Sequence, residues 1–484
     1  MQYAYPSYGI NLTHEMMQKS CDIVVRLLDE VGFNVPHDPF LSHLRGKAGV
    51  RIDGQRVHFA PSLTQKYLDR FIAGELPIQP SREMERFKTP EWEVYTAGYA
   101  MMVLDLETEE IRPSTCQDLR DMIKLANSFG VGGMYPIMPQ DLPPLMRDIA
   151  CFKICWEMSQ NIQPITYQQP EQARYAYEMY CVMGKPFRIE LSVPTTMTLD
   201  PTDVSTFLAL YPEFKKNKNF SFVPLCYTML GILKPVTAIG CATMQLAETL
   251  GVHMLFNLFD PEINVRVGMQ AGNPTDLRHV CWAWGSPRRH LFNYLNAQIL
   301  PRLRGEAPER YTATSALLET SSSAVDEQAA LEKMAVGLTA ALQGCRTFQN
   351  AGTLCVDDLF SGTQFVIDME IVSYIREVVE SFNPHPDILN MEGLYEECRD
   401  VALGNETFIS HPNTARRCRN IVPSSNRIVR EKLRAFMAHR KTLKDRAREE
   451  ALERIRTFEP YHLPDDKQKE LDKIYARAEA ELGK

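Results

Sequence analysis

The sequence predicts an α/β protein, a (β/α)8 TIM barrel with an α-rich N-terminal extension and a helical C-terminal extension. Between residues 91 and 385, short β-prone segments alternate eight times with amphipathic helical segments. An open doubly wound sheet, the alternative fold, usually has fewer strands and often a glycine-rich phosphate turn, and the chain contains neither GxGxxG nor GxxxxGK. We therefore expect three regions, at residues 1–90, 91–385 and 386–484.

The N-terminal region is predicted to hold a helix and a β-hairpin. Thr13 is a suitable N-cap for a helix whose apolar residues recur at helical spacing, and Gly32 would end that helix. The segment RIDGQRVHF, residues 51–59, places Asp53 and Gly54 between two β-prone arms, which is typical of a hairpin turn. Both features indicate a structural role for this region.

The central region is predicted to contain eight strand-helix units. We expect its strands at residues 94–97, 132–138, 163–168, 187–193, 220–226, 253–259, 312–318 and 346–352. We expect the helices after them at residues 115–130, 144–159, 171–183, 202–216, 235–250, 286–303, 324–343 and 363–382. Beyond them, the charged stretch 427–456 has apolar residues spaced for one long helix, which we expect to pack on the barrel or on a second subunit.

The composition excludes several classes of protein. The 484 residues are 44% hydrophobic and carry a net charge of −8, which is ordinary for a globular protein and unlike a general nucleic-acid binder. No run of about 18 apolar residues and no secretion signal is evident, so we expect a cytoplasmic protein without a membrane partner. The 12 cysteines are scattered, and the close pair Cys151 and Cys155 has no histidine nearby, so we expect reduced thiols and no bound metal.

Polar residues that alternate with apolar ones along a barrel strand indicate the interior face. In FRIELSV, residues 187–193, this pattern places Arg188, Glu190 and Ser192 inside, where Arg188 and Glu190 could pair. The same rule puts His253 and Asn257 on one face of the predicted sixth strand, with Asn257 nearer its carboxyl end.

Active sites in barrels lie at the carboxyl ends of the strands, where the βα loops converge. The loop after the predicted seventh strand, within LLETSSSAVDEQA at residues 317–329, is rich in hydroxyl and acidic side chains. We expect its polar residues to border the active site: Glu319, Ser321, Ser322, Ser323 and Asp326. Helix capping is the alternative role for the serines.

Several segments, in order, resemble the trimethylamine methyltransferase superfamily. They are GINLTHEMMQKSCDIVVRLLDEVGFNV, GVRIDGQRVHFAPS, NIQPITYQQP, PLCYTMLGILKPVTAIGCATMQLAETLG, DEQAALEK and NAGTLCVDDLFSGTQFVIDMEI. The resemblance covers nearly the whole chain and rests on the order of the segments rather than on one motif. It implies a (β/α)8 barrel that moves a methyl group from a methylamine to the cobalt of a corrinoid, a cobalamin carried by a separate small protein.

The trimethylamine enzymes of that superfamily contain pyrrolysine, which would fall in or near the loop after strand seven. This chain has ordinary serines there, so it is similar to the branch without pyrrolysine, whose members use quaternary amines such as glycine betaine. A quaternary nitrogen already carries its charge, so its leaving group departs as a neutral amine without a proton donor or a metal. Orientation and desolvation are then the main contributions of the protein, and the resemblance assigns no catalytic residue.

The resemblance also implies which residues could hold the substrate. A trimethylammonium group is commonly held against aromatic faces, each contributing about 0.5 to 2 kcal/mol. The aromatic candidates near predicted carboxyl ends are Tyr95, Tyr99, Tyr227, Phe348 and Phe360. Candidate donors to a substrate carboxylate are Asn257, Gln349 and Asn350, and no arginine stands at a predicted carboxyl end.

Other functions stay open at this point. The substrate could be another betaine or carnitine, and the acceptor could be folate. A non-catalytic methylamine-binding protein with the same barrel is the alternative from a different class. The expected partners are a small quaternary amine, a cognate corrinoid protein and further copies of the chain, without nucleic acid.

Overall fold

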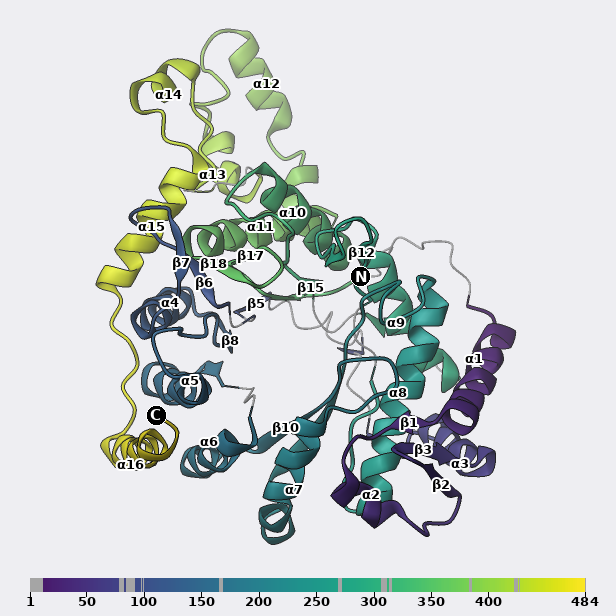
Figure 1. Cartoon of the computed structure of the whole chain (residues 1–484). Coiled ribbons are helices and arrows are strands. Elements are labelled where there is room, and N and C mark those ends of the chain that lie inside the picture. The colour runs from purple at the N-terminus through teal and green to yellow at the C-terminus, as the bar shows by residue number, and fades with distance from the viewer. Residues whose placement is uncertain are drawn as a thin grey trace.

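The computed structural model describes residues 12–483 except residues 78–81, 84–91, 97, 99, 165–168, 269–271, 306–310, 313–315, 383–384, 422–424 and 426. Figure 1 shows an α/β arrangement in which helices surround a central set of strands. The predicted α/β class with parallel central strands is confirmed.

The central strands are β5 (Glu93–Thr96), β8 (Gly132–Met134), β9 (Ile162–Gln163), β10 (Phe187–Val193), β11 (Phe220–Cys226), β15 (Ala316–Leu317) and β16 (Thr347–Gln349). Five of them form a parallel sheet in the order β15-β16-β5-β8-β9, and β10 pairs in parallel with β11. Because β16 pairs with β5, the last and first central strands lie side by side. Among the described residues no ladder joins β9 to β10, so the structure does not show a closed sheet.

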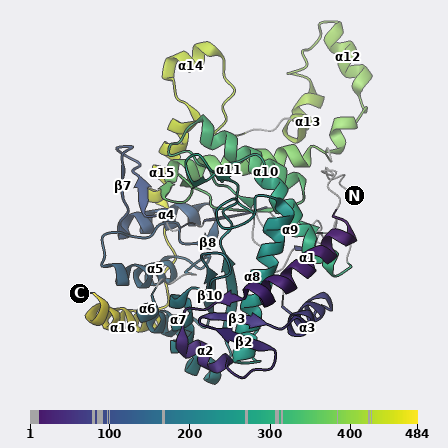
Figure 2. The ribbon, with the colours of Figure 1, turned by 45° about the vertical axis from the view of Figure 1, so that its right-hand side comes forward.

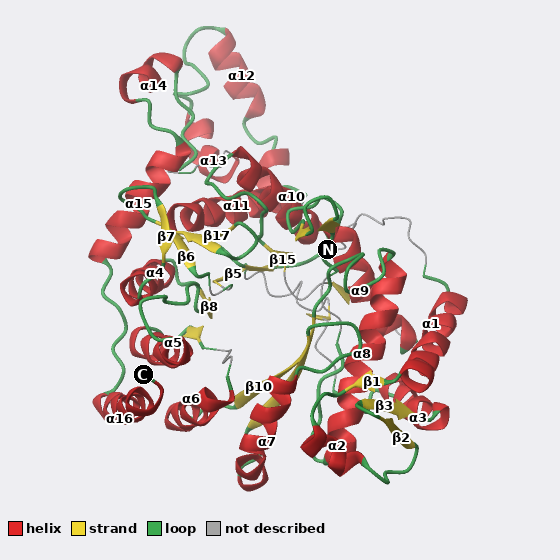
Figure 3. Cartoon of the chain, viewed as in Figure 1, coloured by secondary structure: helices red, strands yellow, loops and turns green. Residues whose placement is uncertain are grey.

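In the described part of the chain, eight helices lie between residues 116 and 380, two of them between β11 and β15, and Figure 3 shows them outside the strands. They are α4 (Cys116–Ser128), α5 (Pro144–Met158), α6 (Pro170–Met183), α7 (Pro201–Lys216), α8 (Ala238–Phe259), α9 (Arg289–Leu303), α10 (Glu327–Leu342) and α11 (Gly362–Glu380). Thr115 and Asp118 form a capping box at the start of α4. Gly184 ends α6 in the left-handed conformation, which glycine adopts without strain.

The prediction of a strand at residues 253–259 is wrong. These residues are the last turns of α8, which is 22 residues long and buried on nearly all sides. A short apolar run without polar alternation fits a buried helix and a buried strand equally well, so periodicity could not separate them. Instead, Val265 makes a parallel bridge to Phe222 of β11 and takes the place of the sixth strand.

The N-terminal region confirms the predicted helix and hairpin. It contains α1 (His14–Arg26), the π-turn η1 (Leu27–Val31), β1 (Phe33–Asn34), α2 (Asp38–Leu44), β2 (Val50–Asp53), β3 (Arg56–Phe59) and α3 (Pro61–Ile72). The side chain of Thr13 accepts a hydrogen bond from the backbone N–H of Met16, and Gly32 has a φ of 73° at the end of the π-turn. A further short strand, β4 (Arg82–Glu83), pairs with β14 (Tyr311–Thr312).

Two small sheets are built from loops that follow the central strands. The first, in the order β17-β18-β6-β7, joins the loop after β5 to the loop after β16. Its strands are β6 (Met102–Leu104), β7 (Ile111–Pro113), β17 (Thr353–Leu354) and β18 (Leu359–Ser361). The second is the hairpin of β12 (Thr275–Asp276) and β13 (Cys281–Trp282), in the segment between Val265 and α9.

The C-terminal region is helical, but the single helix predicted over residues 427–456 is wrong. Its elements are the 3-10 turn η4 (Pro386–Leu389), α12 (Leu394–Ala402), α13 (Pro412–Ile421), α14 (Leu433–His439), α15 (Leu443–Thr457) and α16 (Asp465–Leu482). Arg440 leaves the helix with a φ of 53°, and Thr442 then caps α15. Figure 2 shows α12 and α14 projecting away from the ring of helices.

None of the helices within the described ranges is both long and apolar enough to span a lipid bilayer.

Candidate active site

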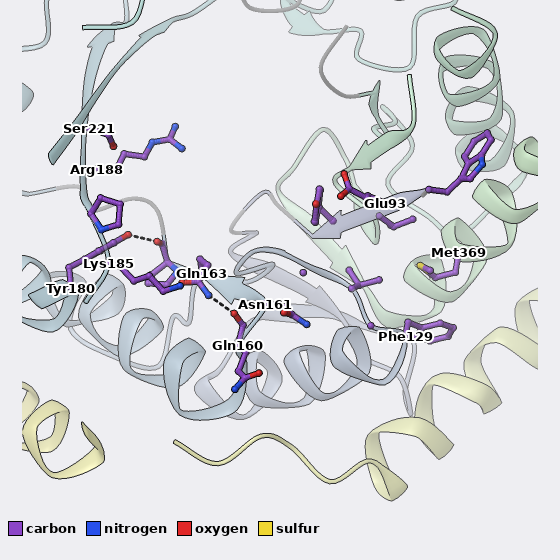
Figure 4. Close-up of a pocket in the computed structure, with 18 residues that line it drawn as sticks. Glu93, Phe129, Gln160, Asn161, Gln163, Tyr180, Lys185, Arg188, Ser221 and Met369 are labelled. Atoms are coloured by element: carbon purple, nitrogen blue, oxygen red, sulfur yellow. Dashed lines mark hydrogen bonds between the residues drawn. The ribbon is translucent and has the colours of Figure 1, made fainter. Parts of the chain in front are cut away.

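A cavity of about 770 Å³ lies at the amino ends of the central strands (Figure 4). Phe129, Gln160 and Lys185, which line it, come just before β8, β9 and β10. Ligands of parallel α/β proteins bind at the opposite, carboxyl ends, where the loops after the strands converge. The site is therefore expected among the loops that follow the strands.

Three aromatic side chains form a series in the loops after β11 and after Val265. Tyr227 directly follows β11, and its ring is nearly parallel to that of Trp282, with centroids 6.5 Å apart. Trp282 in turn stacks on Trp284, with centroids 4.8 Å apart and planes at 15°. The guanidinium carbon of Arg289 lies 5.6 Å from the ring centroid of Trp284. The order in space is thus Tyr227, Trp282, Trp284 and Arg289.

Carboxylates dominate the electrostatic environment of Tyr227. Burial raises the pKa of its hydroxyl, and the negative charges of Glu190, Asp203 and Asp357 are among those that raise it further. Burial also raises the pKa of Asp203 to about 6 and that of Asp357 to about 7, because a carboxylate loses hydration there. The charges that act on this ring are carboxylates, and in their ionised form they attract a cation.

The buried guanidinium of Arg289 links the loop after Val265 to the loop after β15. It donates through Nη1 to the carbonyl of Trp284 at 3.2 Å and to the Glu319 carboxylate. Glu319 also accepts a hydrogen bond from Asn350 Nδ2 at 2.6 Å, which ties in the loop after β16. Burial raises the pKa of Glu319, an effect that Arg289 opposes. This network fixes three loops relative to one another.

A second buried ion pair anchors the loop after β16. Lys333 Nζ donates to Asp368 at 2.6 Å, and neither side chain is exposed. The same carboxylate accepts the backbone N–H of Gly352 at 2.7 Å. Removing one partner of such a pair leaves an unpaired buried charge, which costs about 3–5 kcal/mol.

The loop after β16 has a strained backbone. Cys355 and Val356 have φ angles of 49° and 69°, and a β-branched residue rarely adopts such a conformation. Two hydrogen bonds to the loop after β15 hold it there: Cys355 N–H to the Ser322 carbonyl at 2.7 Å, and Val356 N–H to the Thr320 carbonyl at 2.9 Å. Backbone strain of this kind clusters at functional sites.

Gly98, in the loop after β5, brings that loop against the strained one. It has a φ of 116°, and a Cβ there would lie 3.0 Å from Thr353 Cγ2 and 3.5 Å from Asp357 Cβ. Asp357 therefore lies where the loops after the first and last central strands meet.

The structure assigns different positions to the five polar residues predicted in the loop after β15. Glu319 is buried, Ser323 and Asp326 are exposed, and Asp326 caps α10 by accepting the backbone N–H of Ala329. Ser322 is only 4% exposed, and its hydroxyl donates to Asp326 at 2.8 Å, so it supports the residue that caps α10 and is not itself the cap. Ser321 donates to the Trp282 carbonyl at 3.4 Å and thus lies beside the aromatic series.

Of the four aromatic candidates within the described residues, the structure brings only Tyr227 into the series. Phe348 is buried and stacks on Trp92 with centroids 5.7 Å apart, and Phe360 is buried against Gly352. Tyr95 lines the cavity at the amino ends. Tyr99 lies outside the described residues.

The candidate donors to a carboxylate have different surroundings. Asn350 pairs with Glu319, and Gln349 is half-buried on β16. Asn257 lies on α8 rather than at the end of a strand, because the strand assignment behind its placement is wrong. Its side chain accepts from the Tyr67 hydroxyl at 2.8 Å and donates to the carbonyls of Pro261 and Ile263, which fixes the chain after α8.

On β10 the predicted alternation is confirmed. Phe187, Ile189, Leu191 and Val193 are buried, whereas Arg188 lines the cavity beside Ser221 (Figure 4). Arg188 pairs with Glu190 at 2.8 Å, and burial raises the pKa of Glu190.

Sequence reasoning missed Trp282, Trp284, Arg289 and Asp357. Two of the chain's four tryptophans stand within CWAWGSP, residues 281–287, which was a usable signal. Because the sixth strand was predicted at residues 253–259, the segment of residues 281–287 had no predicted position relative to the carboxyl ends of the strands. Arg289 likewise supplies an arginine near the carboxyl ends, where the sequence indicated none.

Comparisons with known proteins agree on one family. The profile of the family described as trimethylamine methyltransferase (MTTB) matches residues 7–483. A glycine betaine methyltransferase of Desulfitobacterium hafniense is 25% identical over 399 residues, which are 78% of this chain and 78% of that protein. The trimethylamine methyltransferase MttB2 of Methanosarcina mazei is 28% identical over 183 residues, which are 37% of this chain and 34% of that protein.

Proposed function

Because the chain belongs to the trimethylamine methyltransferase family, we propose that it transfers a methyl group from glycine betaine to the corrinoid of a partner protein. The observation that carries the choice of a quaternary amine is the series Tyr227, Trp282 and Trp284 beside acidic side chains. Aromatic faces and nearby carboxylates both attract a fixed cation. A quaternary amine needs no proton donor, because it leaves as a neutral amine.

The chain's own contribution is to bind and orient the methyl donor. The ion pairs of Arg289 with Glu319 and of Lys333 with Asp368 hold the surrounding loops in place, so the donor meets a preorganised surface. When bound, a reduced corrinoid supplies the nucleophilic cobalt that accepts the methyl group. The residues fit such a partner, because Ser323 and Ala324 present small, exposed side chains in the loop after β15.

The remaining parts of the proposal concern the whole chain. We propose that β5 to β16 form a (β/α)8 barrel spanning residues 91–385, because the last strand pairs with the first. The N-terminal and C-terminal extensions then cover residues 1–90 and 386–484. A cytoplasmic location, homo-oligomers and the absence of a resident metal stay predictions.

A turnover assay with reduced cobalamin as acceptor tests this function. Glycine betaine should methylate the cobalt, which is followed by its absorbance, whereas dimethylglycine and trimethylamine should be poor donors. Equal rates from the three amines would contradict the proposal. Tight binding of glycine betaine without turnover, also with the partner's corrinoid protein, would favour the non-catalytic alternative.

A further inference from the structure

Arg289 is buried, yet within the described parts of the chain three of its five N–H donors are unused. Its side chain is 0% exposed, and Nη1 serves both the Trp284 carbonyl and Glu319. Nε and Nη2 have no partner among the described residues. A guanidinium carries five N–H donors, and buried donors in native proteins are nearly always paired.

The unused atoms are those that suit a carboxylate. Nε and Nη2 lie on one edge of the guanidinium, and two parallel N–H groups on an edge match the two oxygens of a carboxylate. Glu319 does not use this edge, since it is bound through Nη1. The ion pair with Glu319 therefore accounts for the positive charge of Arg289. It does not account for the free Nε and Nη2 donors.

The two tryptophans next to Arg289 show the same pattern. The indole Nε1 atoms of Trp282 and Trp284 are buried and also lack a partner within the described parts of the chain. An indole N–H can only donate. Two stacked rings and one guanidinium thus present four unused donors, Nε and Nη2 of Arg289 and the two indole nitrogens, in one cluster.

The other end of the series has the opposite character. The negative charges of Glu190, Asp203 and Asp357 act on the Tyr227 hydroxyl, whereas Arg289 stands beyond Trp284. Arg289 therefore attracts an anion, and the aromatic faces of the tryptophans beside it attract a cation within a short distance. Such polarity suits a zwitterion in which one molecule carries a quaternary nitrogen and a carboxylate.

We infer that Arg289, with the indole N–H groups of Trp282 and Trp284, binds the carboxylate of the methyl donor and so selects betaines over quaternary amines without a carboxylate. This inference rests on the proposed function. Arg289 is then a specificity residue, held in place by Glu319 and the Trp284 carbonyl.

Calorimetry on the full chain tests this selection with glycine betaine, choline and tetramethylammonium. Choline keeps the trimethylammonium group and replaces the carboxylate by a hydroxyl. The wild-type chain should bind glycine betaine at least about tenfold more tightly than choline, because a charge-assisted pair is lost with choline. Equal affinities would overturn the inference and leave the proposed function standing. Binding of none of the three amines would overturn both.

Variants assign the selection to residues. Arg289→Lys keeps a charge for Glu319 but removes the edge, so the affinity for glycine betaine should fall about tenfold while that for choline stays within about twofold. Arg112→Lys is the matched control, since Arg112 pairs with Asp105 and Asp118 away from the series and should leave both affinities unchanged.

A second pair of variants covers the case in which Arg289→Lys does not fold. Trp282→Phe and Trp284→Phe keep an aromatic ring and remove one indole N–H each. Each should weaken glycine betaine binding about threefold or more and leave choline binding within about twofold. Parallel losses for both amines would mean that the tryptophans act only through their rings, and would overturn their role as donors.

Discussion

Asp203 and Asp357 are acidic side chains that act on Tyr227, and Asp357 is the one of the two whose pKa lies nearer to neutral pH. Burial, with the nearby charges of Glu319 and Asp358, raises its pKa to about 7 from an ordinary value of 3.8. It is therefore largely neutral at pH 6 and largely charged at pH 8. A fixed cation beside Tyr227 attracts only the charged form.

We predict that the affinity for glycine betaine rises between pH 6 and pH 8, by up to about tenfold, as Asp357 loses its proton. Asp357→Asn should flatten this profile, whereas Asp53→Asn, at an exposed position on β2 of the N-terminal hairpin, provides the control. Calorimetry across the pH range measures the effect. An affinity that is independent of pH in the wild-type chain would place the cation away from Asp357.

The same titration bears on folding. The pKa of Asp357 in the folded chain lies above that of the unfolded chain, so the folded state binds the proton more strongly. The resulting stabilisation is full below about pH 4 and is lost as the pH rises through about 7. At pH 8 the folded chain therefore holds Asp357 in its charged form at a cost to the free energy of unfolding, as is common at functional sites.

A second prediction concerns the rings. Tyr227→Ala and Trp282→Ala should each weaken quaternary amine binding by about 1–2 kcal/mol, because each removes a π face. Tyr227→Phe keeps the face and should bind nearly as well as the wild-type chain. Phe348→Ala should instead lower the melting temperature without a comparable loss of affinity, since Phe348 packs on Trp92. Unchanged affinity in a folded Trp282→Ala variant would contradict the role of the series.

At the scale of elements, the sequence was informative where polarity alternates. The observed β10 and β11 have the predicted bounds, because polar residues on one side distinguish a strand from a helix. α8 is apolar on nearly every side, so its last turns could not be distinguished from a strand. That one misassignment displaced Asn257 and hid Trp282 and Arg289, because positions in a barrel depend on the count of strands.

The loop after β15 yields a prediction about the partner. Ser322 is buried and cannot take a large side chain without displacing the loop, whereas Ser323 is exposed. Ser323→Trp should therefore leave glycine betaine affinity within about threefold while slowing methyl transfer to the corrinoid protein. Ser323→Ala is the control for loss of the hydroxyl. Transfer at the wild-type rate in Ser323→Trp would show that the corrinoid approaches elsewhere.

At the scale of the whole molecule, the C-terminal segment that projects in Figure 2 carries many apolar side chains on its surface. Leu389 is 80% exposed, Ile409 86% and Leu433 72%, and none of the residues in α12 or α14 is buried. Exposed apolar groups gathered on one segment mark a site of association. The predicted homo-oligomer would use this surface.

Light scattering tests that prediction. The wild-type chain should have a mass above that of a monomer, and Leu389→Asp combined with Ile409→Asp should lower it. Asn405→Asp adds a charge to the same segment without removing an apolar group and should leave the mass unchanged. A monomeric wild-type chain at micromolar concentration would contradict the prediction.

The last two helices, α15 and α16, pack on the outer helices of the central region, and α15 joins helices from its opposite ends. α15 packs on α4 and α11, the first and last of the eight outer helices, and α16 packs on α5 and α6. Arg454 of α15 lies 3.8 Å over the ring of Phe129 and donates to the Ser128 carbonyl at 2.9 Å. During synthesis the chain emerges from its N-terminus, so α4 must wait for some 300 residues to be made before its partner appears. Early-made surface on α4 and α5 thus stays uncovered until α15 and α16 are made, and apolar surface exposed on an incomplete chain is prone to aggregation.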